Sequence, residues 1–420
     1  MTGSTSFPKL RRTRHEVEAD IRQFKSLDMC TKPNNRLMTG IHKGSQQVHE
    51  VCRAAYNEYF HTNAVLADME QGLGQMQNDV LRWTVGLLNG GAEGRANMMV
   101  GGSESIFCAV HAAREWAREN LPNAKEPYEI VMPRTAHAAF DKAAHYLGLK
   151  MNRIAAGSDF RADVDALDSA VTPNTIMIVG SAPCWGFGLV DPIPEIASVA
   201  EKHGLWMHVD CCVGGFLLPF MERLGMTLPV FDFRLEAVSS ISADLHKHGF
   251  AAKPASTVSY RSEALQKYHN TGVAIDNWQC GMYKSHGVVG SRPGSAVAAA
   301  WAVMSYLGEE GYMDITRQTF AIKEKMIAGI ESIEDFKVLR NESLLVPFRS
   351  NSLEMLNVFG GLVERGYFPW GTFDPMYVHP SAEPVDEIVI DQFLGDLAEI
   401  GQGVREGVIT AEALATYIGN

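Results

Sequence analysis

One lysine of this sequence lies where covalent chemistry with a carbonyl compound can occur. Lys247 belongs to the segment SISADLHKHGF at 240–250, directly after an apolar run that is typical of a strand. A lysine among small and aromatic residues at the end of a strand is well placed to lose its hydration, and this favours the neutral amine that Schiff-base formation requires. An ordinary surface lysine is the alternative, and other motifs must decide between the two.

A Gly-Gly-Ser turn at 101–103 precedes an amphipathic stretch at 106–119. The glycines let backbone N–H groups approach a ligand closely, the Ser103 hydroxyl adds a donor, and the helix that follows presents its positive end. The pattern therefore favours an anion site that contains Gly102 and Ser103. A turn with a serine N-cap is the alternative.

Asp210 and His137 each follow a predicted strand, at 205–210 and 129–132. In an open parallel sheet, ligands bind beyond the carboxyl ends of the strands, so both side chains are expected beside a ligand. A carboxylate there can keep a pyridinium nitrogen protonated, and a flat imidazole can stack on a ring. A turn aspartate and a structural histidine are the alternatives.

The elements that must position these residues follow an α/β order. Helical stretches alternate with strand-like runs from about Gly101 onward, and the strands are expected at 129–132, 175–180, 205–210, 237–242 and 255–260. The stretch 193–203 has helical spacing, starts beside two prolines and ends before Gly204. Before Gly101 only helical segments are expected, notably 45–59 and 69–88, and a smaller α+β region follows Leu307.

The composition excludes several classes of protein. The chain has 420 residues, 46% of them hydrophobic, and a net charge of −12. It therefore lacks the excess of basic residues that binds the phosphates of a nucleic acid. Residues 1–14 are polar and basic, unlike a secretion signal, and the apolar run 296–304 is shorter than the ~20 residues of a membrane helix. The seven cysteines lack metal-ligand spacing. We therefore expect a cytoplasmic protein that holds no metal.

Taken together, the motifs resemble those of the sphingosine-1-phosphate lyases, in the group II decarboxylase-like family of enzymes that depend on pyridoxal 5′-phosphate (PLP). The resemblance runs from about residue 40 to 400. The segments that carry it are GGSES (101–105), AHAAFDKAA (136–144), HVD (208–210), SISAD with HK (240–247) and GSRPG (290–294).

This resemblance implies the PLP-dependent transferase fold type I, which is aspartate aminotransferase-like. A large domain with a mixed or parallel sheet is joined to a small C-terminal α+β domain. Residues 1–75 are then an N-terminal helical segment that contributes to the dimer and the active site. Residues 76–307 form the PLP-binding domain, and residues 308–420 form the small domain.

The resemblance also assigns cofactor roles. It implies that Lys247 carries PLP as a Schiff base, Asp210 pairs with the pyridine nitrogen and His137 stacks on the ring. The residues implied to bind the cofactor phosphate are Gly102, Ser103 and His246 of one subunit and Gly290, Ser291 and Arg292 of its neighbour. A homodimer with shared active sites follows.

Substrate recognition departs from the family pattern. Lys253, six positions after Lys247, matches the family's substrate-phosphate ligand, and Asn63 matches an asparagine of the same pocket. Leu66, however, stands where the family has a histidine, and His42 stands where it has a tyrosine of the catalytic pocket. An imidazole with a pKa near ~6.5 can act there as a general base or as a phosphate ligand.

The expected reaction is a retro-aldol cleavage of a phosphorylated long-chain β-hydroxy amine, giving an aldehyde and phosphoethanolamine. Lys284 and His286 add two candidate anion ligands before the GSRPG segment. The alternatives are an amino-acid α-decarboxylase, for which Lys253 has no evident use, an aminotransferase, and a non-catalytic protein of the same fold. The intact set of Lys247, Asp210 and His137 speaks against the last.

Overall fold

A seven-stranded sheet forms the centre of the larger domain in the computed structural model, which describes residues 10–28, 40, 42, 44–67, 69–270, 274–384 and 387–410. Six strands run parallel to one another, and β7 is antiparallel to both of its neighbours, β1 and β6. The strands in spatial order are Arg95–Met99 (β1), Ser256–Tyr260 (β7), Val238–Ala243 (β6), Trp206–Asp210 (β5), Thr175–Ser181 (β4), Glu129–Pro133 (β2) and Lys150–Ile154 (β3).

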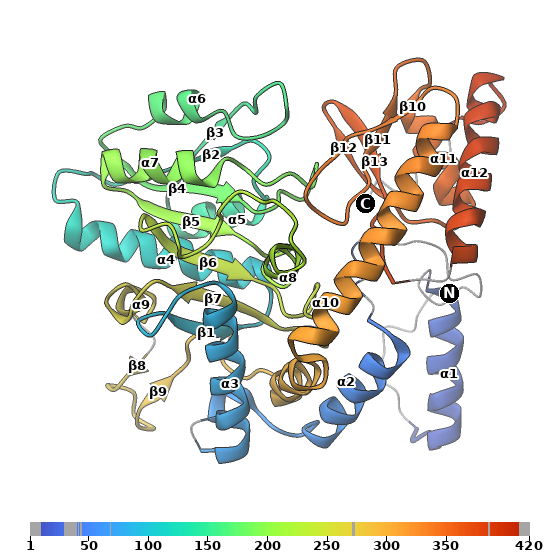
Figure 1. The fold of residues 1–420 in the computed structure, drawn as a ribbon. Coiled ribbons are helices and arrows are strands. Elements are labelled where there is room, and N and C mark those ends of the chain that lie inside the picture. Colours follow the sequence, from blue (N-terminus) through green and yellow to red (C-terminus); the bar gives the residue numbers. More distant parts are fainter. Residues whose placement is uncertain are drawn as a thin grey trace.

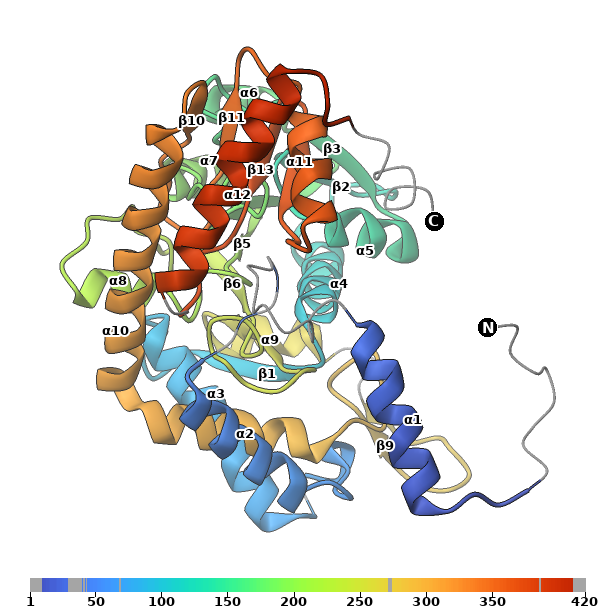
Figure 2. The same ribbon diagram turned by 90° about the vertical axis from the view of Figure 1, so that its right-hand side faces the viewer.

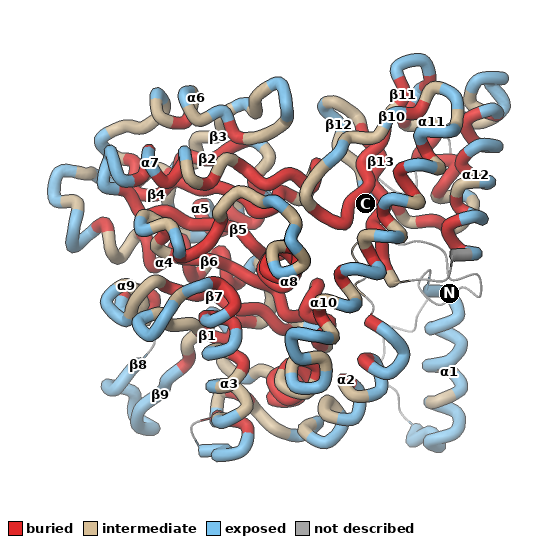
Figure 3. The backbone as a smooth tube through the Cα atoms, viewed as in Figure 1, coloured by how far each residue is buried: buried red, intermediate tan, exposed pale blue. Residues whose placement is uncertain are grey.

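Both faces of this sheet are covered, because successive side chains of a strand point to opposite faces. Ile178 packs with α7 (Ile193–His203) in one apolar cluster, whereas Val179 packs with α4 (Gly102–Asn120) in another. Two-sided burial explains the nearly continuous apolar runs of the central strands. Figure 3 shows these strands buried along their length. The shorter helices of this domain are Ala139–Leu147 (α5), Val164–Ser169 (α6), Leu218–Arg223 (α8) and Glu263–His269 (α9).

The long helix α10 (Gly294–Ser332) connects the two domains, and Figure 1 shows it running from one to the other. Gly308 interrupts it with φ 53° and ψ −171°. Residues before this kink pack with α2 (Gln46–Glu58) and α3 (Gln71–Leu87), whereas Met326 and Ile330 belong to the core of the small domain.

The small domain is an antiparallel sheet covered by helices. Its strands, in spatial order, are Phe336–Val338 (β10), Phe348–Ser350 (β11), Met376–His379 (β13) and Trp370–Phe373 (β12). The helices are Met355–Glu364 (α11) and Glu387–Arg405 (α12). Remaining elements are the one-turn helix Ala64–Leu66 (η2) and the hairpin of Ala274–Ile275 (β8) and Tyr283–Lys284 (β9).

Helix α1 (Arg14–Leu27) has no buried residue and lies apart from the body of the chain (Figure 2). A Thr13–Glu16 capping box starts it. Val17, Ile21 and Phe24 are exposed on the helix. The spacing of these three residues places them on one face, which is apolar and uncovered in the single chain.

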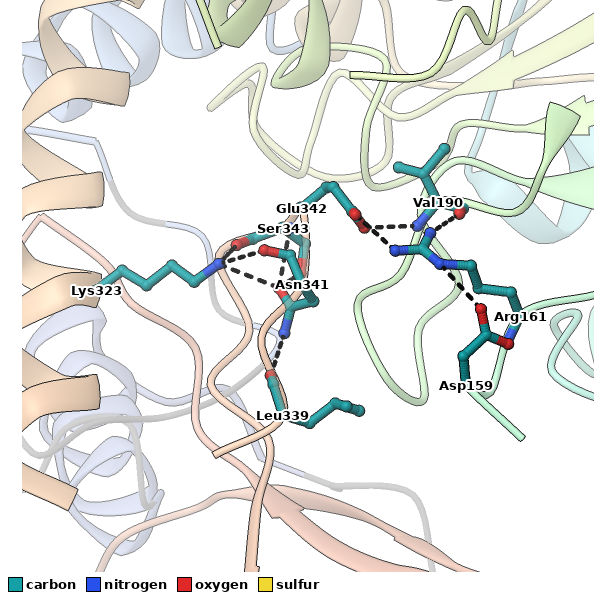
Figure 4. Close-up of polar contacts among 8 residues, drawn as sticks. All are labelled: Asp159, Arg161, Val190, Lys323, Leu339, Asn341, Glu342 and Ser343. Carbon is teal, nitrogen blue, oxygen red and sulfur yellow. Dashed lines mark hydrogen bonds and ion pairs between the residues drawn. The ribbon is translucent and has the colours of Figure 1, made fainter. Parts of the chain in front are cut away.

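Polar contacts fasten the small domain to the large one (Figure 4). Lys323 of α10 is buried and donates to the backbone oxygens of Asn341 and Ser343 at 2.8 and 2.6 Å. Glu342 lies between these two residues in the sequence. It forms an ion pair of 2.6 Å with Arg161 and accepts a hydrogen bond from Val190 N at 3.1 Å. One short loop thus bonds to α10 on one side and to the large domain on the other.

The predicted α/β class is confirmed, and the five expected strands correspond to β2, β4, β5, β6 and β7 within one residue at each end. Helix α7 has the predicted bounds. The expectation of helices alone before Gly101 is wrong, since Arg95–Met99 forms β1. In the part of the chain that the structure describes, no helix combines the length and the apolar character that crossing a membrane requires.

Candidate active site

A cavity of about 330 Å³ opens beyond the carboxyl ends of β4, β5 and β6. Strand register explains the location: Ser181, Asp210 and Ser242, at or near the ends of their strands, are paired across the sheet. The predicted residues that line the cavity are His42, Gly102, Ser103, His137, Asp210, His246, Lys247 and Lys253. Its wall also includes Trp370 of the small domain, so three distant parts of the chain meet here.

Lys247 lies in the turn after β6, with Nζ 2.9 Å from Oδ2 of Asp244. Burial acts to lower the pKa of Lys247, but the negative charges of Asp244 and Asp210 outweigh it and the pKa is raised. The expected neutral amine is therefore not what the chain alone provides, because a carboxylate three residues earlier holds the ammonium. Burial would raise the pKa of Asp244, and Lys247 and His246 lower it overall.

The start of α4 forms a cradle for an anion. Gly101 has φ 145°, a backbone conformation that side-chain-bearing residues rarely adopt, and α4 begins at Gly102. A Cβ on Gly102 would lie 2.8 Å from Oδ2 of Asp244 and 3.0 Å from Sγ of Cys212, so only glycine fits. The first N–H groups of a helix have no partner within the helix, and Gly102 and Ser103, which begin α4, line the cavity.

His246 borders the same cradle. Its Nδ1 accepts a hydrogen bond from Ala255 N at 3.1 Å, which leaves Nε2 as the protonated nitrogen. The cavity also contains the buried hydroxyl of Ser181, which has no hydrogen-bond partner among the described residues. Backbone donors, an imidazole N–H and an unsatisfied hydroxyl fit a phosphorylated, polar ring compound such as PLP.

Asp210 and His137 supply the groups that such a ring needs. Oδ1 of the buried Asp210 accepts from Cys212 N at 3.0 Å, which fixes the carboxylate at the end of β5 and leaves Oδ2 for a ligand. His137 follows β2 and is exposed, and its Nδ1 accepts from Ala139 N at 3.1 Å. An imidazole held by its own backbone turn presents a fixed face to the cavity.

His42 is buried beside a second histidine and a carboxylate. Its ring lies 4.5 Å from that of His248 in an edge-to-face arrangement, and its Nδ1 lies 3.3 Å from Oε1 of Glu383. Burial, followed by the charges of Lys247 and Lys253, lowers the pKa of His42 to about 3. The imidazole is therefore neutral at physiological pH.

Lys253 lies in the loop between β6 and β7, where it is exposed and lines the cavity. It forms no ion pair with any acidic residue in the described ranges. An unneutralised ammonium on the open side of the cavity suits a phosphate on the substrate.

The residues predicted on the GSRPG segment lie outside this cavity of their own chain. Asn63, expected in the substrate pocket, instead donates from Nδ2 to Ser291 Oγ at 3.0 Å and accepts from Arg292 N at 3.1 Å. It thereby holds the segment that begins at Gly290. Lys284, His286 and Arg292 together line a separate cavity of about 240 Å³, and Leu66 is half exposed in η2.

Several residues of the site were not singled out from the sequence. Asp244 had a signal, since its spacing from Lys247 brings the two side chains together in a turn. Glu104 had none: its carboxylate accepts from Val100 N at 2.7 Å and from Val288 N at 2.7 Å, and so ties the cradle to the segment before Gly290. Trp185 and Trp370 both lie in the cavity wall, with 6.5 Å between their ring centroids, and they come from different domains.

Comparisons with known proteins agree with this geometry. A family model described as the pyridoxal-dependent decarboxylase conserved domain matches residues 11–351. Sphingosine-1-phosphate lyase 1 of Rattus norvegicus is 37% identical over 390 residues, which are 91% of this chain and 67% of that protein. An L-aspartate/L-glutamate decarboxylase of Pyrococcus horikoshii is 32% identical over 355 residues, 84% of this chain and 89% of that protein.

The solved structure of a sphingosine-1-phosphate lyase from Burkholderia pseudomallei matches with a TM-score of 0.90 and 30% identity, over 99% of this chain and 96% of that one. The likeness therefore covers both domains, and the expected fold type I is confirmed. The rat protein is longer, and the chain spans about two thirds of it.

Proposed function

Because the chain belongs to the family of pyridoxal-dependent decarboxylases, we propose that it is a PLP-dependent carbon–carbon lyase that cleaves a phosphorylated long-chain β-hydroxy amine, such as sphingosine 1-phosphate, to an aldehyde and phosphoethanolamine. The observation that carries the proposal is Lys253, which lies in the wall of the cavity that contains Lys247 and forms no ion pair with the acidic residues of the described ranges. A decarboxylase of a simple amino acid has no second phosphate to place there.

The residues that line the cavity fit the cofactor. Lys247 would hold it through its amine, Asp210 would pair with the pyridine nitrogen, and His137 would lie against the ring. Gly102, Ser103 and His246, all in the cavity wall, would bind the cofactor phosphate. When bound, PLP supplies an electron sink for whichever bond at the substrate Cα stands perpendicular to its ring.

The protein selects the bond and moves the proton. Lys253 binds the substrate phosphate, which fixes the amine relative to the ring. His42, neutral and buried, accepts the proton of the β-hydroxyl as the Cα–Cβ bond breaks and the carbonyl of the aldehyde forms. Asp244 holds a positive charge on Lys247 whenever its amine is free, so the proton needed at Cα can be delivered from Nζ.

A product assay tests the proposal. The purified protein, loaded with PLP, is incubated with sphingosine 1-phosphate and separately with aspartate and glutamate, and fatty aldehyde and carbon dioxide are measured. We expect aldehyde from the first and no carbon dioxide from the others, and Lys247→Ala to abolish both turnover and an absorption band near ~420 nm. Carbon dioxide without aldehyde would replace the lyase by an amino-acid decarboxylase, the activity that the name of the Pyrococcus relative states.

We also propose a homodimer in the cytoplasm. The uncovered apolar face of α1 and the position of Ser291 outside its own cavity support the dimer, because both would be satisfied by a second copy. The reducing compartment is supported by the cysteines of the described ranges, all of which are free, including adjacent Cys211 and Cys212.

A further inference from the structure

We infer that Glu383 is a positioning residue for the reaction: its carboxylate orients His42 so that Nε2 faces the substrate as the proton acceptor. The inference rests on the proposed lyase function and extends it to a residue of the small domain. It starts from the contact between Nδ1 of His42 and Oε1 of Glu383, at 3.3 Å.

The contact bears on which ring nitrogen carries the proton: Nδ1 lies within ion-pair distance of Oε1, although it forms no hydrogen bond among the described residues. Glu383 offers only acceptor oxygens when it is ionised, so a proton on His42 is stabilised at Nδ1, the nitrogen that faces the carboxylate. Nε2 then has a free lone pair. Because Nδ1 lies beside Glu383 and His42 lines the cavity, Nε2 is in this inference the nitrogen that accepts from a substrate hydroxyl.

The pair is shielded from water, which gives the carboxylate a larger effect. The side chains of His42 and Glu383 are 2% and 7% exposed. Ser381 Oγ donates to Glu383 Oε1 at 3.4 Å, and the ring of His248 covers an edge of His42. In such surroundings, neighbouring charges are screened little.

The carboxylate is also needed for the reaction step itself. As the Cα–Cβ bond breaks, the O–H bond of the substrate breaks and an N–H bond forms at Nε2, so His42 becomes an imidazolium. Burial opposes that charge most, followed by Lys247, Lys253 and His246, whereas Asp244 favours it. The carboxylate of Glu383, 3.3 Å from Nδ1, is placed to favour it as well. Of the two carboxylates, Glu383 contacts the ring. Its role parallels that of the aspartate that orients the histidine of a serine protease.

The contact also explains a pairing across the sequence. His42 stands where the resembled family has a tyrosine, and a phenol has no second ring atom that must be held by an acceptor. A histidine at this position needs such an acceptor, and the loop after β13 supplies one from 341 positions further along the chain.

The test uses Glu383→Gln, which keeps the shape and removes the charge. With PLP-loaded protein and sphingosine 1-phosphate, we expect kcat to fall by about 10²-fold with KM, the cofactor absorption and the thermal midpoint unchanged. Glu334→Gln is the matched control, because its carboxylate is 80% exposed on the same domain. It should leave every one of these quantities unchanged.

A double-mutant cycle separates orientation from structural support. If Glu383 acts through His42, adding Glu383→Gln to His42→Ala should lower kcat by less than twofold. An unchanged kcat in Glu383→Gln overturns the inference, as does a loss of the same size in the His42→Ala background or a loss of cofactor absorption. A wild-type protein that releases no aldehyde overturns the proposed function and this inference together, whereas aldehyde release with a fully active Glu383→Gln overturns only the inference.

Discussion

Lys253 is the residue at which the proposed substrate class can be tested most directly. Replacing it by alanine removes a charge-assisted hydrogen bond to the substrate phosphate. The value of kcat/KM for sphingosine 1-phosphate should therefore fall, by an amount that corresponds to a loss of about 2–3 kcal/mol of transition-state stabilisation. The cofactor absorption should stay unchanged, because the phosphate cradle proposed for the cofactor comprises Gly102 and Ser103 rather than Lys253. Steady-state kinetics with the phosphorylated amine measure the effect.

The exposed Lys337 of β10 provides a control for loss of a surface charge. Lys337→Ala should retain the wild-type kcat/KM, since the residue lies in the small domain and outside the cavity wall. If Lys253→Ala also behaves as the wild type, the phosphate is not bound there and the substrate must be recognised by other contacts.

At single positions, the sequence was informative where a residue type is required by the chemistry. Lys247, Asp210 and Gly102 were predicted because each follows a strand or starts a helix, and in the structure all three line one cavity at the carboxyl ends of the strands. Residues that contact the site from a distant part of the sequence show no such pattern. Glu383 and Trp370 could not be assigned, because their proximity to His42 and Trp185 depends on the packing of the small domain.

Among the elements, α10 and the loop 339–343 form a junction whose stability should respond to pH. Burial lowers the pKa of Lys323 to about 8, although Glu324 and Glu342 raise it. The lysine of an unfolded chain has a pKa near ~10.4, so between about pH 8 and pH 10.4 the unfolded chain binds a proton that the folded chain does not. The free energy of unfolding therefore rises with pH in this window, by an amount on the order of 3 kcal/mol.

Lys323→Met removes this titration and leaves the buried carbonyl oxygen of Ser343 and the partly buried one of Asn341 without their donor. We expect the variant to be less stable than the wild type at pH 7, by about 2–5 kcal/mol, because each buried acceptor without a partner destabilises the fold. The difference should grow between pH 8 and pH 10. Thermal midpoints of both proteins, measured across this range, give the answer, and a difference that stays constant with pH would contradict the assigned titration.

The strands that the sequence predicted are buried on both faces, and each contains at least one valine or isoleucine. β1, with the sequence RANMM, has no β-branched residue and pairs only with β7, so local preference did not reveal it. The small domain likewise gave no strand assignments. Its strands have three or four residues, and β10, β11 and β13 are held in one apolar cluster with α10, α11 and α12 rather than by their own sequence pattern.

For the whole molecule, the main prediction is that two subunits share each site. If Ser291 and Arg292 complete the phosphate site of a partner, Lys247→Ala and Arg292→Ala inactivate different halves of a site. Mixing the two inactive proteins under conditions that exchange subunits should restore up to about a quarter of the wild-type activity, because half of the dimers are mixed and each of these has one intact site.

Sedimentation must show a dimer in the same buffer. Each variant mixed with itself serves as the control and should stay inactive. A fully active monomer would exclude shared sites, and so would two variants that fail to complement although they form mixed dimers.

The wall of the cavity combines His42 with Trp370, which follows it by 328 positions. During synthesis, the pocket therefore cannot close until Trp370 has left the ribosome, and its contacts are among the slowest to form because they join distant segments. A cofactor that binds only the closed pocket stabilises finished chains and leaves nascent or truncated ones unprotected. The supply of the vitamin from which the cofactor derives would then set how much of this protein survives quality control in the cell.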